Sequence, residues 1–420
     1  MQEELTAGIT LNVIPTKQFK TTRINISFLT ELSERSGLVM RTLLADLLET
    51  SSQKYPTQKD VALELSEMYG ASFGTTVDRR GQVHSLNFIL NCVNDNYLLE
   101  KVDLLAKSLA FLQEMIMRPL VDKQGFDQAT FTRQKQNLKA YIEAVKDNKQ
   151  TYAALKLQEN YFETELQKVP LYGTVADLEE LDATKLYHYY QNVIATDQVQ
   201  IVISGDVDPV LVQAQLKKLD LPARPKKQLS LTYQQAKRAV VTEVSERQEL
   251  NQSKLDLAYR LPVSYRSKDH YAALIFNALF GGTPQSRLFA NVREKASLAY
   301  YANSNFDPFR QLLIVQTGIK ATDRRKAQAL IAEQLVALKN GEFSAEQLEQ
   351  VKLHLLNAYE SRLDNQQTEM TRTKLDLLAQ RSISASEWKK SLLQVTKEDI
   401  CRVAALVELQ TVFFLDGGQS

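Results

Sequence analysis

The sequence predicts an α+β protein of two homologous lobes, each a mainly antiparallel sheet packed by helices on one face. Three observations support this fold class. The chain has 420 residues, enough for two or three domains of about 150 residues. Strand-like and helix-like segments are largely separated along the chain instead of alternating regularly. The second half repeats the order of segments of the first half, which indicates duplication of a unit of roughly 200 residues.

The N-terminal lobe is predicted to begin with strands, because apolar and polar residues alternate over 9–13 and 23–28. A helix follows over 37–48, where leucines recur at three- and four-residue steps. A second helix is expected to start at the capping residue Thr57 and to stop at Gly70. The later segments are a hairpin over 72–92, helices over 97–117 and 127–145, further helix through 162, a helix over 181–190 and a strand over 199–203.

A linker is predicted over 221–238, where two prolines and a cationic run interrupt the periodicity. The N-terminal lobe then spans 1–220 and the C-terminal lobe 239–420. Ligands often bind between two such lobes. The segments expected in the C-terminal lobe are strands over 254–259, 312–317 and 411–415, and helices over 270–280, 326–339, 345–363 and 398–405.

The composition points to a globular protein with no nucleic-acid or membrane partner. Apolar residues make up 44% of the chain and charged residues 24%, which excludes disordered and collagen-like proteins. The formal net charge is only +1, so no global field attracts nucleic acid or anionic lipid. The N-terminus does not resemble a signal peptide, and no run of about 18 apolar residues occurs. With two widely spaced cysteines, Cys92 and Cys401, we expect a cytoplasmic protein with reduced, buried thiols.

Histidine is scarce, which limits the catalytic possibilities. None of the four histidines shares a helical turn with another; they are His84, His188, His270 and His354. His270 follows Asp269, but adjacent residues on a helix do not face each other, so we expect a surface histidine at a helix start. A hydrolase with its own unrecognised site is disfavoured, because no His-Asp/Glu or Cys-His arrangement has a workable spacing.

The C-terminal lobe contains two candidate binding motifs. The glycines at 281–282 are not followed by the Lys-Ser/Thr of a phosphate-binding loop, and Pro284 lacks an N–H. We therefore expect a helix end, a turn and a new helix capped by Ser286. Arg293 and Tyr300 offer a bidentate donor and an aromatic hydroxyl suited to a peptide carbonyl or carboxylate. By residue chemistry alone, a solvated arginine and a half-buried tyrosine are the commoner arrangement.

The run over 271–301 resembles the C-terminal half-unit of the pitrilysin/insulinase-like zinc peptidases. It contains Phe-Gly-Gly at 280–282, Ser-Arg-Leu-Phe at 286–289, Arg-Glu-Lys at 293–295 and Leu-Ala-Tyr at 298–300. Residues 203–208 and 414–417 resemble the closing strands of that family. The resemblance implies the fold shared by LuxS-type metalloenzymes and mitochondrial processing peptidase. It also implies that Arg293 and Tyr300 bind the peptide backbone near the scissile bond.

The N-terminal lobe departs from the family at the metal site. Active members carry His-x-x-Glu-His on the first helix, where two histidines hold zinc and the glutamate activates water. Counting back from 54–56, this motif falls on 42–46, so its three functional positions are Thr42, Ala45 and Asp46. The third ligand, a glutamate, is expected near Ala140 or Tyr141; Glu143 lies close, but no full ligand set can be assembled. The resemblance therefore implies no metal and no cofactor.

The favoured hypothesis is a non-catalytic subunit of a heterodimeric metallopeptidase. The resemblance implies that it binds and positions peptide substrate for a His-x-x-Glu-His partner, and that it is no enzyme on its own. Residues 13–22 and 65–71 are similar to a bacterial group associated with the 5-aminopentanol modification of elongation factor P. That association implies no chemical role. The alternative is a scaffold or peptide-binding protein without proteolytic output; the substrate and the choice between homodimer and heterodimer stay open.

Overall fold

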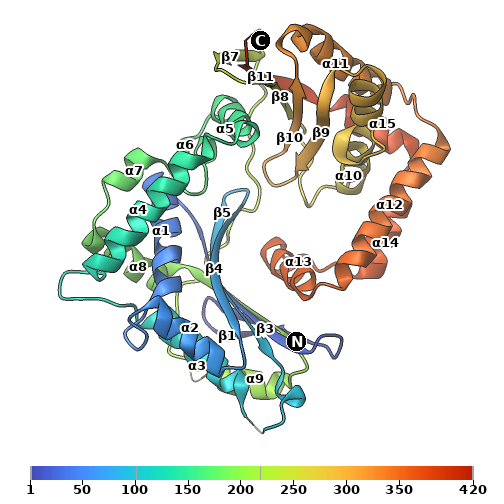
Figure 1. The fold of residues 1–420 in the computed structure, drawn as a ribbon. Helices are drawn as coiled ribbons and strands as arrows, with labels where there is room; N and C mark the ends of the chain where they lie inside the picture. The colour runs from blue at the N-terminus through green and yellow to red at the C-terminus, as the bar shows by residue number, and fades with distance from the viewer. Residues whose placement is uncertain (1, 101, 218, 419–420) are drawn as a thin grey trace. The chain divides into compact units, whose positions relative to one another are not determined.

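The computed structural model describes residues 2–100, 102–217 and 219–418. The chain forms two compact units, which we describe separately. Unit 1 comprises Met1–Glu143, Pro170–Ser230 and Leu363–Ser382, and unit 2 comprises Ala144–Val169, Leu231–Arg362 and Ile383–Ser420. Figure 1 shows the helices and strands of both units.

Unit 1 is built on a six-stranded sheet of order β1-β2-β6-β3-β5-β4. All neighbouring strands are antiparallel except β2 and β6, which are parallel. The strands are β1 (Gln2–Thr6), β2 (Ile9–Pro15), β3 (Thr21–Glu31), β4 (Ser72–Arg80), β5 (Val83–Val93) and β6 (Gln198–Gly205). One face is apolar because alternate residues such as Ile24, Ile26 and Phe28 point into the core.

The main helical layer of unit 1 covers this apolar face. Its core residues come from α1 (Ser36–Thr50), α2 (Gln58–Glu67), α3 (Leu104–Met117), α4 (Gln128–Val145), α7 (Val175–Glu179), α8 (Ala183–Thr196) and α9 (Pro209–Leu216). The predicted cap at Thr57 is confirmed, because Thr57 and Asp60 form a capping box. The prediction of a helix over 97–117 is wrong at its start. Asp95–Tyr97 forms only a 3₁₀ turn, and α3 begins after Asp103, whose carboxylate accepts from the Ala106 N–H at 2.9 Å.

Unit 2 contains a five-stranded sheet of order β7-β11-β8-β10-β9. Its strands are β7 (Thr242–Arg247), β8 (Ser253–Arg260), β9 (Ala299–Asp307), β10 (Leu312–Ile319) and β11 (Glu408–Asp416). The parallel pair is β7 and β11, and the other neighbours are antiparallel. This order matches β2-β6-β3-β5-β4 of unit 1, with the parallel pair in the same place. The matching topology supports the predicted duplication.

The helices of unit 2 mostly cover one face of its sheet. They include α10 (His270–Asn277), α11 (Arg324–Lys339), α12 (Ala345–Leu363), α14 (Ala385–Leu393) and α15 (Lys397–Ala405). Helix α10 continues into a π-helical turn over Ala278–Gly282, and a second π-helical segment spans Leu288–Lys295. The short α6 (Glu165–Lys168) also belongs to this unit.

One helix lies on the opposite face of each sheet, and each comes from the other half of the sequence. Helix α13 (Gln366–Ala379) belongs to unit 1 and contacts β6. Helix α5 (Lys149–Tyr161) belongs to unit 2, where Leu157 packs with Ala258 and Phe413. The boundaries predicted for the two lobes, 1–220 and 239–420, follow the repeat in the sequence and stay a prediction. Each compact unit consists of several chain segments, because unit 2 includes α5 from the first half of the sequence and unit 1 includes α13 from the second half.

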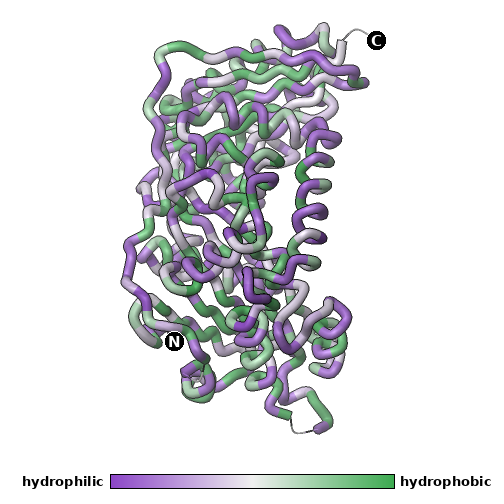
Figure 2. The backbone as a smooth tube through the Cα atoms, turned by 90° about the vertical axis from the view of Figure 1, so that its left-hand side faces the viewer, coloured by the Kyte–Doolittle hydropathy of each residue, from purple (hydrophilic) through white to green (hydrophobic). Residues whose placement is uncertain are grey.

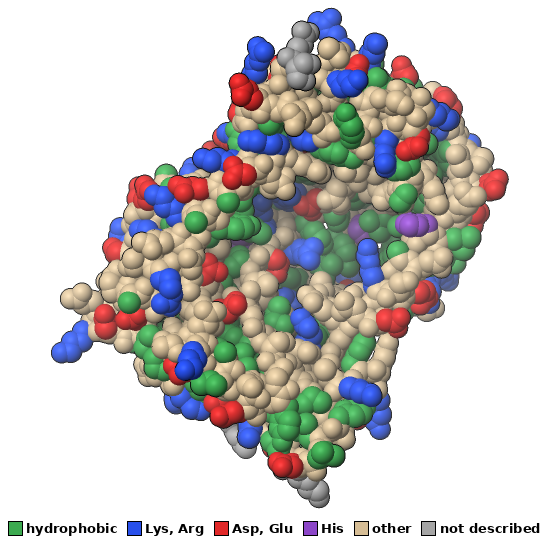
Figure 3. Space-filling model, in the orientation of Figure 1, with side chains coloured by type: hydrophobic (Ala, Val, Ile, Leu, Met, Phe, Trp, Pro, Cys, Tyr) green, Lys and Arg blue, Asp and Glu red, His purple; other side chains and the backbone are tan. Residues whose placement is uncertain are grey.

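Hydrophilic and hydrophobic residues are mixed along the chain (Figure 2) and over the face of the surface seen in Figure 3. Figure 2 shows hydrophilic residues along the helices as well as hydrophobic ones. Across the described residues, none of the helices has the length and the apolar character needed to cross a bilayer. Lysine and arginine side chains are interspersed with aspartate and glutamate on the face seen in Figure 3.

Candidate peptidase-like site

The three predicted motif positions lie on α1, and they offer few metal donors. The Thr42 hydroxyl is within 3.2 Å of the carbonyl oxygens of Leu38 and Leu171. The Ala45 side chain is buried and has no atom that can bind a metal. The backbone carbonyl of Ala45 accepts a hydrogen bond from the Thr75 hydroxyl at 3.1 Å. Asp46 supplies the one carboxylate of the three positions. Since catalytic zinc needs three protein ligands, these positions alone cannot hold it.

Asp46 on α1 has a perturbed carboxyl group. Burial, together with the nearby Glu49 carboxylate, raises the pKa of Asp46 to about 6. The Glu49 carboxylate accepts from both the backbone N–H and the hydroxyl of Thr75, each at 2.8 Å. Thr75 lies on β4, one of the two edge strands of the sheet. Glu49 is therefore engaged in holding α1 against the sheet edge.

The region predicted for the third ligand carries aromatic side chains. The rings of Tyr141 and Tyr172 lie 5.3 Å apart in an edge-to-face arrangement, and burial raises the pKa of Tyr172 to about 12. Ala140 and Glu143 are exposed on α4. Within the described ranges, no cluster of three His, Cys, Asp or Glu side chains is placed to hold a metal ion. The donor set thus does not fit the zinc ion that active members of the family bind at this position.

Arg41 fixes α1 from inside the core, a role that our sequence analysis missed. Its guanidinium donates to Asp197 at 2.5 Å, to the Phe28 carbonyl at 2.7 Å and to the Tyr189 hydroxyl at 3.2 Å. Both charged side chains are almost fully buried. A paired buried charge of this kind is strongly destabilising when one partner is lost. The sequence feature that could have indicated this buried ion pair is the position of Arg41 within the leucine-rich face of the predicted helix.

Two histidines are buried in different units. Burial lowers the pKa of His84 to about 3, assisted by Arg79 and Arg41, so its ring is neutral. Its Nδ1 lies 3.1 Å from the Gln82 carbonyl. The prediction that His270 is a surface residue is wrong. Its side chain is buried, and its ring packs against Tyr265 and Tyr271, because α10 starts inside the core instead of at its edge.

The two cysteines differ in burial. Cys92 is buried and lies 3.5 Å from the Ser108 hydroxyl, and burial raises the pKa of its thiol. Cys401 is only partly buried and packs against the core of unit 2. A thiol with a raised pKa is a poor nucleophile, so Cys92 acts as a core residue as predicted.

The segment around Gly281 is a packed turn. A Cβ atom at Gly281 would approach the Ser304 backbone nitrogen to 2.6 Å, so only glycine fits there. The Thr283 hydroxyl donates to the Ala278 carbonyl at 3.0 Å, and Ser286 accepts from the Phe289 N–H at 3.4 Å. These contacts agree with the expected helix end and cap.

Arg293 and Tyr300 both lie exposed near one end of β9. The Arg293 guanidinium stacks over the Phe289 ring at 4.5 Å from its centroid and lies 3.5 Å from the Glu294 carboxylate. Tyr300 is 63% exposed at the start of β9, which is an edge strand. Ser297 reverses the chain between them with φ of 51°. The structure places both residues in solvent, and their binding role stays a prediction.

The sequence profile of the peptidase M16 inactive domain matches residues 180–355. The chain is 31% identical over 410 residues, 98% of this chain and 96% of the relative, to a protein of Bacillus subtilis named "Probable inactive metalloprotease YmfF". A conserved protein of Enterococcus faecalis has a TM-score of 0.96 and 41% identity, covering 100% of this chain and 99% of its own.

A structure of the peptidase M16 inactive domain from Pseudomonas fluorescens has a TM-score of 0.82 at 16% identity, covering 100% of this chain and 98% of its own, which shows the same fold. The α+β prediction is therefore confirmed. The chain belongs to the peptidase M16 family, as one of its inactive metalloprotease homologues.

Proposed function

We propose that this inactive M16 homologue is the substrate-holding subunit of a heterodimeric metallopeptidase. In this proposal a partner chain with a His-x-x-Glu-His motif supplies zinc, and Arg293 and Tyr300 of this chain hold the peptide backbone. The supporting observation is the contrast between the two units. The α1 positions offer no metal ligand set among the described residues, whereas the Arg293 and Tyr300 side chains, to which we assign the peptide, are exposed.

The location of these two residues suits an extended peptide. An edge strand has backbone N–H and C=O groups that a peptide strand can pair with. An arginine fork and a tyrosine hydroxyl beside β9 would fix the register of such a peptide through its carbonyl oxygens. Positioning of this kind contributes to catalysis even when the metal belongs to another chain, because it orients the scissile bond.

Three finer statements belong to the same proposal. The subunit would work in the cytoplasm, where its two free cysteines remain reduced. The likeness to the elongation factor P-associated group stays a prediction and gives no substrate. The alternative function is a scaffold that binds a partner or a peptide without cleavage, and it shares the same fold.

The test is reconstitution of the full chain with its zinc-bearing partner. The mixture is expected to cleave an unstructured fluorogenic peptide in a zinc-dependent way. Arg293→Met should lower kcat/KM by about tenfold or more, since hydrogen bonds to charged groups are worth roughly 1.5–3 kcal/mol. Tyr300→Phe should lower it by about two- to tenfold, since a neutral hydrogen bond is worth roughly 0.5–1.5 kcal/mol. Arg293→Lys should restore only part of the loss, because lysine lacks the bidentate fork.

The matched controls are Lys295→Met at the same helix end and Tyr69→Phe on the partly exposed Tyr69 of unit 1. Both should keep full activity. Unchanged cleavage by the Arg293 and Tyr300 variants would remove their proposed role. A stable complex that cleaves no peptide in any mixture would favour the scaffold.

A further inference from the structure

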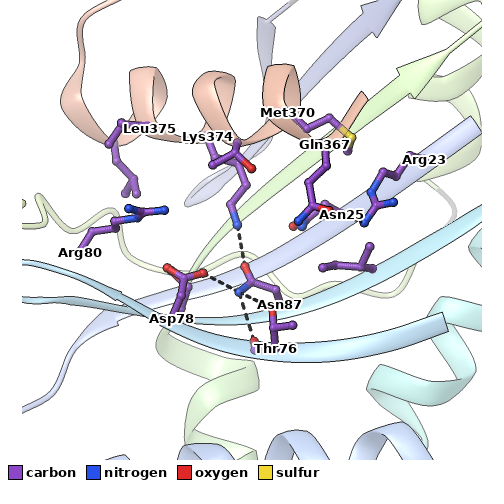
Figure 4. Close-up of a pocket in the computed structure, with 14 residues that line it drawn as sticks. Arg23, Asn25, Thr76, Asp78, Arg80, Asn87, Gln367, Met370, Lys374 and Leu375 are labelled. Atoms are coloured by element: carbon purple, nitrogen blue, oxygen red, sulfur yellow. Dashed lines mark hydrogen bonds between the residues drawn. The ribbon is translucent and has the colours of Figure 1, made fainter. Parts of the chain in front are cut away.

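A pocket lies in unit 1 between α13 and the face of the sheet opposite the main helical layer (Figure 4). Its volume is about 250 Å³. Pockets for drug-sized ligands are usually about 300–1,000 Å³, so this one suits a smaller molecule. No feature of the proposed peptidase function uses it.

The sheet face that lines the pocket is polar, which is unusual beneath a packed helix. Alternate residues of three strands point to this face, namely Arg23 and Asn25 of β3, Asp78 and Arg80 of β4, and Asn87 of β5. A helix docked only for stability would be expected to meet apolar side chains. Core packing alone therefore does not account for the polar side chains that line this pocket.

Lys374 of α13 reaches down to this face. Its ammonium donates to the Asn87 side-chain oxygen at 2.6 Å, and Figure 4 shows it between Arg80 and Arg23. The Asn87 amide in turn donates to Asp78 at 2.8 Å, which fixes its orientation. Burial lowers the pKa of Lys374. An ammonium has three donors, so the bond to Asn87 leaves Lys374 able to bind a ligand as well.

Arg23 is held in a similar way. Its guanidinium donates to the Gln367 side chain of α13 at 3.1 Å, and burial lowers its pKa. A guanidinium has five N–H groups in a planar fork, so one bond leaves most of the fork for a ligand. The hydrogen bonds of Lys374 to Asn87 and of Arg23 to Gln367 are thus to neutral amide oxygens, and the Asp78 carboxylate acts on Lys374 electrostatically.

The pocket has an excess of positive charge. Arg23, Arg80 and Lys374 line it together with a single carboxylate, that of Asp78. Charges that are removed from water are costly unless they are paired. A bound anion would interact favourably with the cationic side chains of this lining, and guanidinium and ammonium groups are the usual protein donors to carboxylate and phosphate oxygens.

We propose that this pocket is a binding site for a small oxyanion, a carboxylate or a phosphate, held by Lys374 and Arg23 with Arg80 at the other end. The direct test is isothermal titration calorimetry of the full chain with inorganic phosphate and, separately, with succinate, at constant ionic strength. Saturable binding of one of them is expected, and the stronger of the two identifies the ligand chemistry. Putrescine, a cation of similar size, should not bind.

Substitutions that are expected to weaken or to tighten anion binding test which residues form the site. Lys374→Met and Arg23→Met should each weaken binding by about tenfold or more, because each removes a charged hydrogen bond. Asp78→Asn removes the negative charge at similar size and should tighten binding severalfold. Lys107→Met, on the exposed face of α3, is the matched control and should leave affinity unchanged.

Circular dichroism verifies that each variant is folded. Lys374→Met and Arg23→Met test the site independently, so one of them suffices if the other is unstable. The proposal is overturned if the wild-type chain binds neither anion at millimolar concentration. It is also overturned if the Lys374, Arg23 and Lys107 variants bind equally well, because the anions would then bind elsewhere on the surface.

Discussion

At the scale of single residues, Asp256 gives unit 2 a pH-dependent stability. This residue lies on β8 with no exposed surface, and the Gln316 amide donates to one of its oxygens at 3.3 Å. Burial raises its pKa to about 7, although Gln316, the Thr317 backbone and Lys254 oppose the shift. Because the folded state holds the proton more tightly than the unfolded chain, the stabilising contribution is present below about pH 4. It is lost as the pH rises through about 7.

We therefore expect the urea midpoint of the wild-type chain to decrease as the pH is raised from 5 to 8. The midpoint of Asp256→Asn should decrease less, because the asparagine side chain cannot ionise. Each pKa unit corresponds to about 1.4 kcal/mol, so the effect is on the order of a few kcal/mol. Glu333→Gln, at an exposed position on α11, is the control and should follow the wild type. An equal fall in the wild type and in Asp256→Asn would show that other groups cause the pH dependence.

The burial of Asp256 could not be predicted from its own strand. The alternation over 254–259 predicted the strand correctly, and it placed Asp256 on the face opposite Leu255 and Leu257. Such a face is normally exposed to water. Here α5 packs on that side of β8. The covering helix lies about a hundred residues earlier in the chain, where no local pattern connects it to this strand.

At the scale of elements, Gln366 fastens α13 to the sheet of unit 1. Its amide nitrogen donates to the carbonyls of Ser204 at 2.8 Å and Thr21 at 3.2 Å, and its oxygen accepts from the Thr21 hydroxyl at 3.0 Å. Gln366 is buried. This single side chain thus connects the start of α13 to two neighbouring strands.

Gln366→Ala is expected to loosen α13 without unfolding the sheet. A buried polar group that loses its partner costs about 1–3 kcal/mol, so amide hydrogens over Gln366–Ala379 should exchange about tenfold faster or more. Hydrogen exchange with mass spectrometry measures this. Gln350→Ala on the exposed face of α12 is the control. Unchanged exchange in α13 would mean that Gln366 does not fasten it.

The elements that the sequence did not predict have weak local patterns. Helix α13 was missed because Met370 and Ala379 are its only buried apolar residues, since it packs against a polar face. Strand β9 was missed because its pattern includes Asn303 and Asn305 and because Ser297 ends the preceding helical segment without glycine or proline. The residue types at 42, 45 and 46 can be read from the sequence without tertiary information, whereas the binding role of Arg293 and Tyr300 stays a prediction.

At the scale of the whole molecule, each compact unit depends on a helix from the other half of the sequence. Helix α5 buries Ala153, Leu157 and Tyr161 in unit 2, and α13 lines the polar face of the unit 1 sheet. A chain divided in the region 221–238 therefore separates each sheet from one of its helices. The duplicated units are similar in topology but are not independent in packing.

We expect fragments 1–230 and 231–420 to fold poorly when each is expressed alone, because the first exposes the apolar side of α5 and the second leaves α13 without its sheet. Co-expression should give a soluble one-to-one complex. The control is the full chain with a protease site placed in 221–238 and cut after folding, which should keep the thermal midpoint of the uncut chain. Cooperative unfolding and native hydrogen-exchange protection of either fragment alone would show that the exchanged helices are dispensable.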